Sequence, residues 1–129
     1  MLFNQIKETC LYIDDIDKTE QFYHGLLGLP IINRAENKHI FFRAGSSVLL
    51  CFIADDSKNK ISPPPHYGSG KLHLAFETTS EEYESWKTQI IGSGIEIIDE
   101  VIWQNGKESF YFHDPNGHVL EIVPEGIWE

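Results

Sequence analysis

Two strand-like runs joined by a turn read Ser109-Phe110-Tyr111-Phe112-His113-Asp114-Pro115-Asn116-Gly117-His118-Val119-Leu120-Glu121. Pro115 fixes its φ angle where a turn requires it, and Asn116-Gly117 tolerates the positive φ of a tight reversal. The flanking residues are aromatic or β-branched, so the pattern predicts a β-hairpin. Alternation along the second strand puts Glu121 on the same face as Val119 and Val123. A carboxylate among apolar strand neighbours indicates either a bound partner or the wet face of an antiparallel sheet.

Length and composition predict one globular domain, residues 1–129. The chain is long enough to bury its own core, and 41% hydrophobic with 23% charged residues is typical of a soluble protein. No apolar run approaches the ~20 residues of a membrane span, and no signal peptide is recognisable, so we expect a cytoplasmic protein without a membrane partner. Cys10 and Cys51 are too few for a disulfide framework. A formal net charge of −10 disfavours nucleic acid as a partner.

Residues 1–56, called module one, contain the signals of a βαβββ unit. A strand is predicted over residues 2–13, and a capping box formed by Asp17 and Glu20 opens a helix. Three further strands are predicted near residues 29–34, 39–44 and 47–54. Residues 57–70 are rich in proline and glycine and are interpreted as a connecting loop.

Residues 71–129, called module two, repeat this order of elements. A first strand is predicted over residues 71–78, and Thr79 with Glu82 forms a second capping box. Further strands are predicted at residues 95–103, 108–113 and 118–124. Glu8 and His73 each lie five residues before the end of the first strand of their module, which favours an internal duplication. The predicted fold is α+β, with two tandem βαβββ modules forming a curved mixed sheet around a cleft.

Strand parity places three polar side chains on the inward faces of this fold, namely Glu8, His73 and Glu121. In module one, Leu50 takes the place that Glu121 takes in module two. One imidazole and two carboxylates from three strands form a ligand set that suits a divalent metal with open positions for water and substrate. An ordinary buried histidine and solvated carboxylates remain the alternatives.

The chain resembles the vicinal oxygen chelate superfamily, which includes glyoxalase I, methylmalonyl-CoA epimerase, extradiol dioxygenases, fosfomycin-resistance proteins and bleomycin-binding proteins. The residues that carry the resemblance are Leu11-Tyr12-Ile13-Asp14-Asp15-Ile16, Phe22-Tyr23, Leu27-Gly28-Leu29-Pro30, His73-Leu74-Ala75-Phe76 and Asp114-Pro115-Asn116-Gly117-His118-Val119-Leu120-Glu121. The resemblance implies one divalent ion per site, Zn, Mn, Ni or Fe, with metal ligands Glu8, His73 and Glu121. It implies a glyoxalase-like lyase or isomerase acting on a small substrate whose vicinal oxygens chelate the metal.

Catalysis in such a site requires a base, and the resemblance nominates a metal-bound carboxylate. Glu121 and Glu8 are therefore the first candidates. Tyr111 shares their inward parity and follows them, with Tyr12 and His113 as further candidates. The fourth ligand of glyoxalase I falls on Leu50, which cannot bind a metal, and this departure counts against an orthodox glyoxalase I.

A fosfomycin-type thiol transferase is the first alternative. The run from Ser109 to Phe112 resembles the fosfomycin-resistance proteins, whose serine and tyrosine there contact the phosphonate. Their threonine near the first ligand is replaced by Cys10 and their lysine by Val101, so a neutral or singly charged substrate is favoured over a phosphonate. A metal-free protein that binds a small molecule or drug is the second alternative, with a pocket lined by Trp103, Phe52, Phe110 and Trp128.

The expected assembly is a homodimer. A small curved sheet with a cleft leaves strand edges and apolar surface that a partner would cover. Paired modules in the resembled superfamily meet either within one chain or across two, and the connecting loop permits both arrangements.

Overall fold

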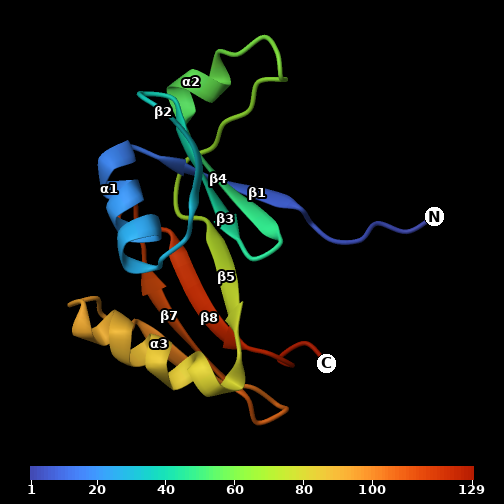
Figure 1. Ribbon diagram of the computed structural model, residues 1–129, viewed down its shortest axis with the longest axis vertical. Helices are drawn as coiled ribbons and strands as arrows, with labels where there is room; N and C mark the ends of the chain where they lie inside the picture. The colour runs from blue at the N-terminus through green and yellow to red at the C-terminus, as the bar shows by residue number, and fades with distance from the viewer. The chain divides into compact units, whose positions relative to one another are not determined.

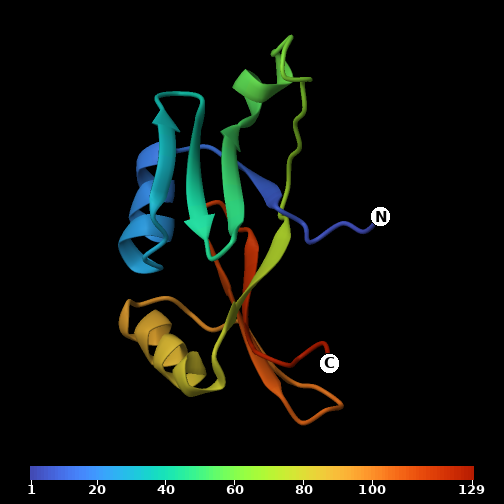
Figure 2. The ribbon, with the colours of Figure 1, turned by 45° about the vertical axis from the view of Figure 1, so that its right-hand side comes forward.

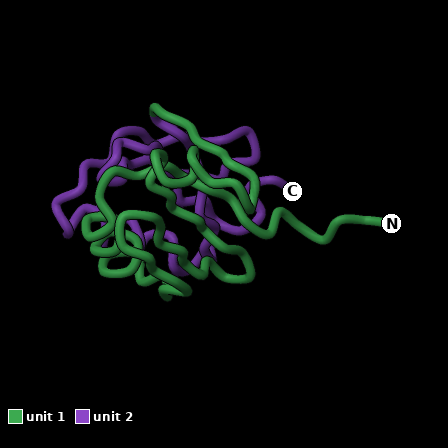
Figure 3. The backbone as a smooth tube through the Cα atoms, turned by 90° about the horizontal axis from the view of Figure 1, so that it is seen from above, with its two compact units in different colours: residues 1–70 green, residues 71–129 purple.

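The computed structural model describes residues 1–129, which form two compact units (Figure 3). The first unit is residues 1–70, and the second unit is residues 71–129. Each contains a four-stranded sheet with helices, so the predicted α+β fold of two tandem modules is confirmed. No helix in the chain has both the length and the apolar character that spanning a membrane requires.

The first unit builds its sheet in the order β1-β4-β3-β2, with β1 and β4 parallel and the other pairs antiparallel. Its elements are β1 (Glu8–Ile13), α1 (Ile16–Glu20), η1 (Gln21–Leu26), β2 (Ile31–Ala35), β3 (His39–Ala44), β4 (Ser47–Ile53) and α2 (Ala54–Lys58). Figure 2 shows α1 and η1 beside β2 and β3. The helical segment η1 continues α1 as a π-helix, and its Tyr23 packs against Phe42 of β3 with ring centroids 5.6 Å apart.

The second unit repeats this topology in the order β5-β8-β7-β6, again with its first and last strands parallel. Its elements are β5 (His73–Thr78), α3 (Ser80–Gly92), β6 (Asp99–Ile102), β7 (Glu108–His113) and β8 (Val119–Pro124). The predicted hairpin joins β7 to β8, with Gly117 at a φ of 82°. Asp114 stabilises the turn because its Oδ1 accepts hydrogen bonds from the backbone amides of Asn116 and His118, at 2.8 and 2.9 Å.

Two helical segments, α3 and the one formed by α1 and η1, each begin at a residue whose side chain caps the helix. Thr79 caps α3 as predicted, since its hydroxyl accepts a hydrogen bond from the amide of Glu82. The prediction that Asp17 caps the first helix was wrong: Asp15 has the extended cap conformation, and its Oδ1 accepts from the amide of Lys18 at 3.0 Å. Asp17 lies inside the first turn and hydrogen-bonds Arg34 instead.

Two predicted strands are several residues longer than those observed, and one helix was missed. Residues 2–7 precede β1, and β6 begins only at Asp99. Helix α2 follows β4 directly, within residues interpreted as strand end and loop. Its first turn holds Asp55 and Asp56, which suit the positive end of a helix, while Ser57 is buried. Five residues are too few for an apolar period to reveal a helix.

The two faces of the second sheet differ in character. On one face α3 covers the strands (Figure 1). Tyr83 of α3 meets the fully buried Phe110 edge-on, with ring centroids 5.4 Å apart. Phe110 therefore belongs to the core beneath α3, and its prediction as a pocket-lining residue was wrong because strand parity turns it away from Tyr111. The opposite face presents His73, Tyr111 and Glu121.

Candidate metal centre

His73 and Glu121 lie on the neighbouring parallel strands β5 and β8. The strand register pairs Ala75 with Glu121. His73 lies two residues before Ala75, so its side chain is on the same face of the sheet as that of Glu121. Its Nε2 lies 3.3 Å from Glu121 Oε1. The Glu121 side chain is only 9% exposed, whereas that of His73 is 51% exposed, so the pair has a buried end and an end that is open to small molecules.

The tautomer of His73 follows from its other ring nitrogen. Nδ1 lies 2.8 Å from the backbone carbonyl oxygen of Val119, which can only accept, so Nδ1 carries the hydrogen. In a neutral ring, Nε2 then directs a lone pair toward the carboxylate of Glu121, and two acceptors face each other. A proton or a cation must stand between them. A divalent ion satisfies this donor set, and histidine ligands of metals usually donate their second ring N–H in this way.

Tyr111 of β7 lies directly across from Glu121 in the antiparallel ladder. Its side chain therefore lies on the same face of the sheet as the Glu121 carboxylate. Burial is the main cause that raises the pKa of Tyr111 above its ordinary value, and the negative charge of Glu121 raises it further. Tyr111 therefore stays protonated near neutral pH, which weakens its candidacy as a base.

Glu8 and Leu50 occupy the corresponding positions of the first unit. Glu8 is exposed on β1, and Leu50 of β4 pairs with Cys10 as Glu121 pairs with Ala75. The place predicted for Leu50 thus agrees with the strand register. Neither unit by itself gathers three histidine, cysteine or acidic side chains into a metal-binding group. A site completed by Glu8 stays a prediction.

The first unit contains a polar contact that the sequence did not predict. The hydroxyl of Tyr12 lies 2.7 Å from Nδ1 of His66, a residue of the segment interpreted as a connecting loop. Burial, together with Cys10, raises the pKa of Tyr12 to about 12, so this phenol stays protonated near neutral pH and is a poor base. No spacing in the sequence indicates this contact, because it depends on how a proline-rich segment folds back over β1.

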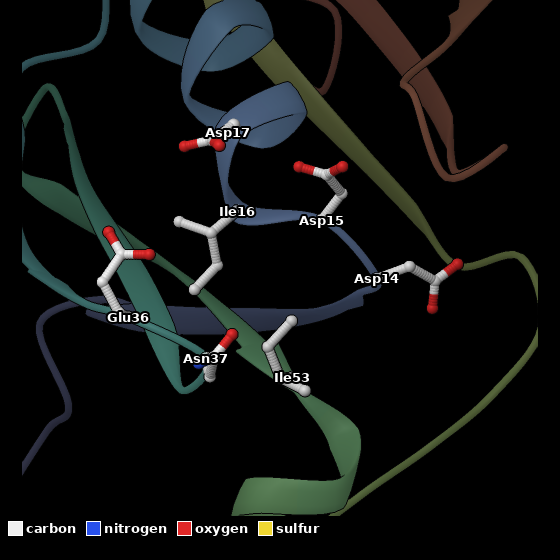
Figure 4. A pocket seen from close by; sticks show the side chains of 7 residues that line it. All are labelled: Asp14, Asp15, Ile16, Asp17, Glu36, Asn37 and Ile53. Carbon is white, nitrogen blue, oxygen red and sulfur yellow. The ribbon is translucent and has the colours of Figure 1, made fainter.

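Figure 4 shows a pocket of the first unit that contains none of the predicted ligands. Its lining residues are Asp14, Asp15, Ile16, Asp17, Glu36, Asn37 and Ile53. Asp15 caps α1, and Asp17 and Glu36 both pair with Arg34. The ion pair of Asp17 with Arg34 connects α1 to β2, so we assign these carboxylates structural roles.

Charge is distributed unevenly between the two units. The second unit has twelve acidic and three basic residues, a formal charge of −9, whereas the first unit has eight acidic and seven basic residues, a formal charge of −1. Of the three lysines in the second unit, Lys87 forms an ion pair with Glu100. The surroundings of Glu121 therefore attract a cation and repel a doubly negative ligand.

The fold and these residues agree with a family match over most of the chain. Residues 5–122 match the model described as the Glyoxalase/Bleomycin resistance protein/Dioxygenase superfamily. The chain belongs to this superfamily, as its resemblance to the vicinal oxygen chelate proteins predicted.

Two similar proteins are named as transferases, and one similar solved structure is named as a lyase. The glutathione transferase FosA of Serratia marcescens is 28% identical over 124 residues, covering 94% of this chain and 81% of FosA. The metallothiol transferase FosB of Staphylococcus saprophyticus is 25% identical, covering 94% and 77%. A crystal structure of lactoylglutathione lyase from Agrobacterium tumefaciens is 31% identical and has a TM-score of 0.93, with 98% of each chain covered.

Proposed function

We propose that this protein is a divalent-metal enzyme that transfers a thiol to a small substrate carrying adjacent oxygen atoms. The observation that carries the proposal is the His73–Glu121 pair, whose facing acceptors suit a bound cation and whose histidine end is open. The names of the relatives support it, since they include a glutathione transferase and a metallothiol transferase. On this support we propose the thiol transferase ahead of the lyase or isomerase that the sequence alone favoured.

A bound divalent ion would supply Lewis-acid polarisation of the substrate oxygens. His73 and Glu121 would hold the ion, with Glu8 of the first unit as the proposed third ligand. Tyr111 lies across from Glu121 in the ladder and lines the same face of the sheet. In the transfer itself, a sulfur–carbon bond forms and a carbon–oxygen bond of a strained ring opens. The thiol proton ends on the ring oxygen, so the product is a simple adduct.

The charge of the site narrows the substrate class. Val101 lies beside Ser109 across β6 and β7, where the resembled proteins have a lysine. Cys10 replaces the expected threonine on β1. With a formal charge of −9 on the second unit, we propose a neutral or singly charged substrate rather than a phosphonate.

A direct test compares two epoxides of similar size. Metal-loaded protein would be incubated with glutathione and either fosfomycin, a doubly charged epoxide, or glycidol, a neutral epoxide with an adjacent hydroxyl. We expect metal-dependent loss of free thiol and an adduct mass with glycidol, and a slower reaction with fosfomycin. Absence of an adduct with both epoxides across Zn, Mn, Ni and Fe(II) would refute thiol transfer. A faster reaction with fosfomycin would refute the charge argument alone.

The lyase or isomerase remains a second candidate. The sequence identity of this chain to the lactoylglutathione lyase structure is 31%, which is higher than its 28% identity to the glutathione transferase. Its test uses the same loaded protein with the hemithioacetal of methylglyoxal and glutathione. Thioester formation, followed by ultraviolet absorbance, would identify this activity. If it appears without epoxide turnover, the order of the two candidates is reversed.

A further inference from the structure

His118 is a buried histidine close to the candidate metal centre, and the proposed reaction does not use it. It is the residue directly before β8, and its exposed fraction is 2%. Its Nδ1 lies 2.9 Å from the backbone nitrogen of Leu72, the residue before His73. A backbone N–H can only donate, so His118 Nδ1 accepts this hydrogen bond and carries no hydrogen of its own. The His118 side chain therefore satisfies the amide that immediately precedes β5.

Three hydrogen bonds join the start of β5 to the start of β8. Besides the bond to His118, the carbonyl oxygen of Leu72 accepts from the amide of Val119 at 2.8 Å. The ring Nδ1 of His73 donates to the carbonyl oxygen of Val119, also at 2.8 Å. Strand β5 is an edge strand that pairs only with β8, and the ends of edge strands open easily. Leu72 resists such opening because both of its backbone polar groups are bonded.

The turn between β7 and β8 holds His118 in place independently of β5. The amide of His118 donates to Asp114 Oδ1 at 2.9 Å, and the carbonyl oxygen of His118 accepts from the amide of Asp114 at 3.0 Å. Asp114 is itself buried, with an exposed fraction of 6%. The imidazole of His118 is thus attached to a firmly bonded turn and offers β5 a fixed acceptor.

The first unit has a different side chain at the corresponding place. Strand register puts Ser47 where the second unit has His118. The backbone bond of the ladder is kept, since the amide of Val48 donates to the carbonyl oxygen of Lys7 at 2.8 Å. The Ser47 hydroxyl donates over a long 3.4 Å to a backbone carbonyl oxygen before β1. The shared fold therefore uses the backbone bond, whereas the buried imidazole acceptor belongs to the unit that holds His73.

We infer that His118 is a positioning residue, which clamps Leu72 and thereby holds the His73 imidazole in its metal-binding orientation. The inference rests on the proposed metal site and gives His118 no chemical step. With Leu72 fixed, His73 Nδ1 stays bonded to Val119, and His73 Nε2 stays 3.3 Å from Glu121 Oε1. Hydrogen bonds behind a metal-binding histidine fix its tautomer and its ring orientation. Without the clamp, the part-buried amide of Leu72 loses its acceptor and the start of β5 loosens.

Two carboxamide substitutions test the clamp. Asparagine bears its oxygen on Cγ, as histidine bears Nδ1, so His118→Asn keeps an acceptor for the Leu72 amide. Glutamine bears its oxygen one bond further out, so His118→Gln removes that acceptor. Calorimetric titration of metal-free protein with Mn(II) or Zn(II) measures the result. His118→Gln should weaken binding about 10-fold, the lower end of the range for residues that orient metal ligands, and His118→Asn should keep most of the affinity.

Thr79→Ala is the matched control for a general loss of stability. It also removes a side-chain acceptor from a backbone amide, that of Glu82, and it lies just beyond the opposite end of β5. Thr79→Ala should unfold at a lower denaturant concentration than the wild type and bind metal with unchanged affinity. Equal losses of affinity in Thr79→Ala and His118→Gln, or in His118→Asn and His118→Gln, would overturn the inference.

An NMR readout without metal separates this inference from the proposed function. In the wild type and in His118→Asn, the ring nitrogen shifts of His73 should show the hydrogen on Nδ1, and the Leu72 amide should exchange slowly. In His118→Gln, both ring nitrogens should share the hydrogen and the Leu72 amide should exchange faster.

The wild-type spectra decide the matter even if His118→Gln does not fold. A hydrogen on His118 Nδ1, or a Leu72 amide that exchanges rapidly, would refute the clamp whether or not the protein binds metal. Spectra as expected from a protein that binds no metal would refute the proposed function and leave the clamp on His73 standing.

Discussion

The two units share a backbone plan and differ in what it presents. Equivalent cross-strand rows read Cys10, Leu50 and Phe41 in the first unit and Ala75, Glu121 and Tyr111 in the second. A leucine beside a phenylalanine thus stands where the second unit has a carboxylate beside a phenol. The comparison teaches that strand order and register fix the positions of side chains, while the residue types at a few positions decide whether a sheet face can bind a cation.

The contrast extends to net charge. The second unit carries a formal charge of −9 and the first unit −1, although the second is the smaller. Since strand order is the same in both, this asymmetry is not a requirement of the fold. It concentrates negative potential on the unit that holds His73 and Glu121.

The largest effect is expected from His73→Ala. This change should reduce bound metal from about one ion per chain to none, because Glu121 and the proposed ligand Glu8 cannot retain a divalent ion without the imidazole. His24→Ala is the matched control, since His24 Nδ1 lies 2.9 Å from the carbonyl oxygen of Leu29 in the first unit, as His73 Nδ1 does from Val119. Elemental analysis after dialysis measures the outcome. Equal metal content in both variants would show that the histidine of the second unit is no more important for metal binding than the histidine of the first.

Leu50→Glu would make the first unit more like the second. The new carboxylate enters a half-buried position beside Phe41, so the free energy of unfolding should fall by about 1–3 kcal/mol without metal. If Leu50 corresponds to a ligand position, saturating Zn(II) or Mn(II) should restore more stability in this variant than in Leu50→Gln. Denaturant unfolding with and without metal checks this. Equal metal responses of the two variants would show that Leu50 lies away from the ion.

The helix caps should be equivalent in the two units. Asp15→Ala and Thr79→Ala should each lower the free energy of unfolding by about 1 kcal/mol, because each removes the acceptor for a first-turn amide. Asp17→Ala should cost less, since it removes only an exposed partner of Arg34. Denaturant titration of the three variants is sufficient. A larger loss for Asp17→Ala than for Asp15→Ala would contradict the assigned cap.

The smallest effect concerns the loop of the first unit. A Cβ at Gly68 would lie 3.0 Å from Cε2 of the Tyr12 ring, so Gly68→Ala must displace that ring. We expect a loss below about 1 kcal/mol and a weaker Tyr12–His66 contact. Gly25→Ala, which meets no atom within 4 Å, is the control and should be neutral or slightly stabilising. Tyr12 ring resonances that do not change in Gly68→Ala would refute the close approach.

Alternation along the strands predicted much of this arrangement. It placed His73, Glu121 and Tyr111 on one face because period-2 parity depends only on counting residues within a strand. The turn residues Pro115 to Gly117 fixed the hairpin, and that hairpin fixed the register between Tyr111 and Glu121. The parity rule also excludes Phe110 from that face, and the pocket proposed for it failed on this point.

The missed features depend on contacts that neighbouring residues do not specify. Asp15 and Asp17 are equally good caps by type, and the pairing of Asp17 with Arg34, seventeen residues later, decides between them. The hydrogen bond of Trp103 to Ser109 requires a side-chain rotamer as well as a face. The contact of His66 with Tyr12 joins residues separated by 54 positions. None of these leaves a periodic signal.

The parallel ladders between first and last strands also bear on how the chain reaches its fold. Strand β5 cannot pair with β8 until the intervening residues have been synthesised. The hydrogen bond between His73 and Val119, for example, joins residues 46 positions apart. Closing such a loop has a conformational entropy cost before the ladder gains its hydrogen bonds. During synthesis, each unit must therefore remain open until its final strand emerges. The hairpin of β7 and β8 can form first, and β5 can then pair with β8. The strands of the second unit that are synthesised last therefore provide the template on which its first strand is ordered.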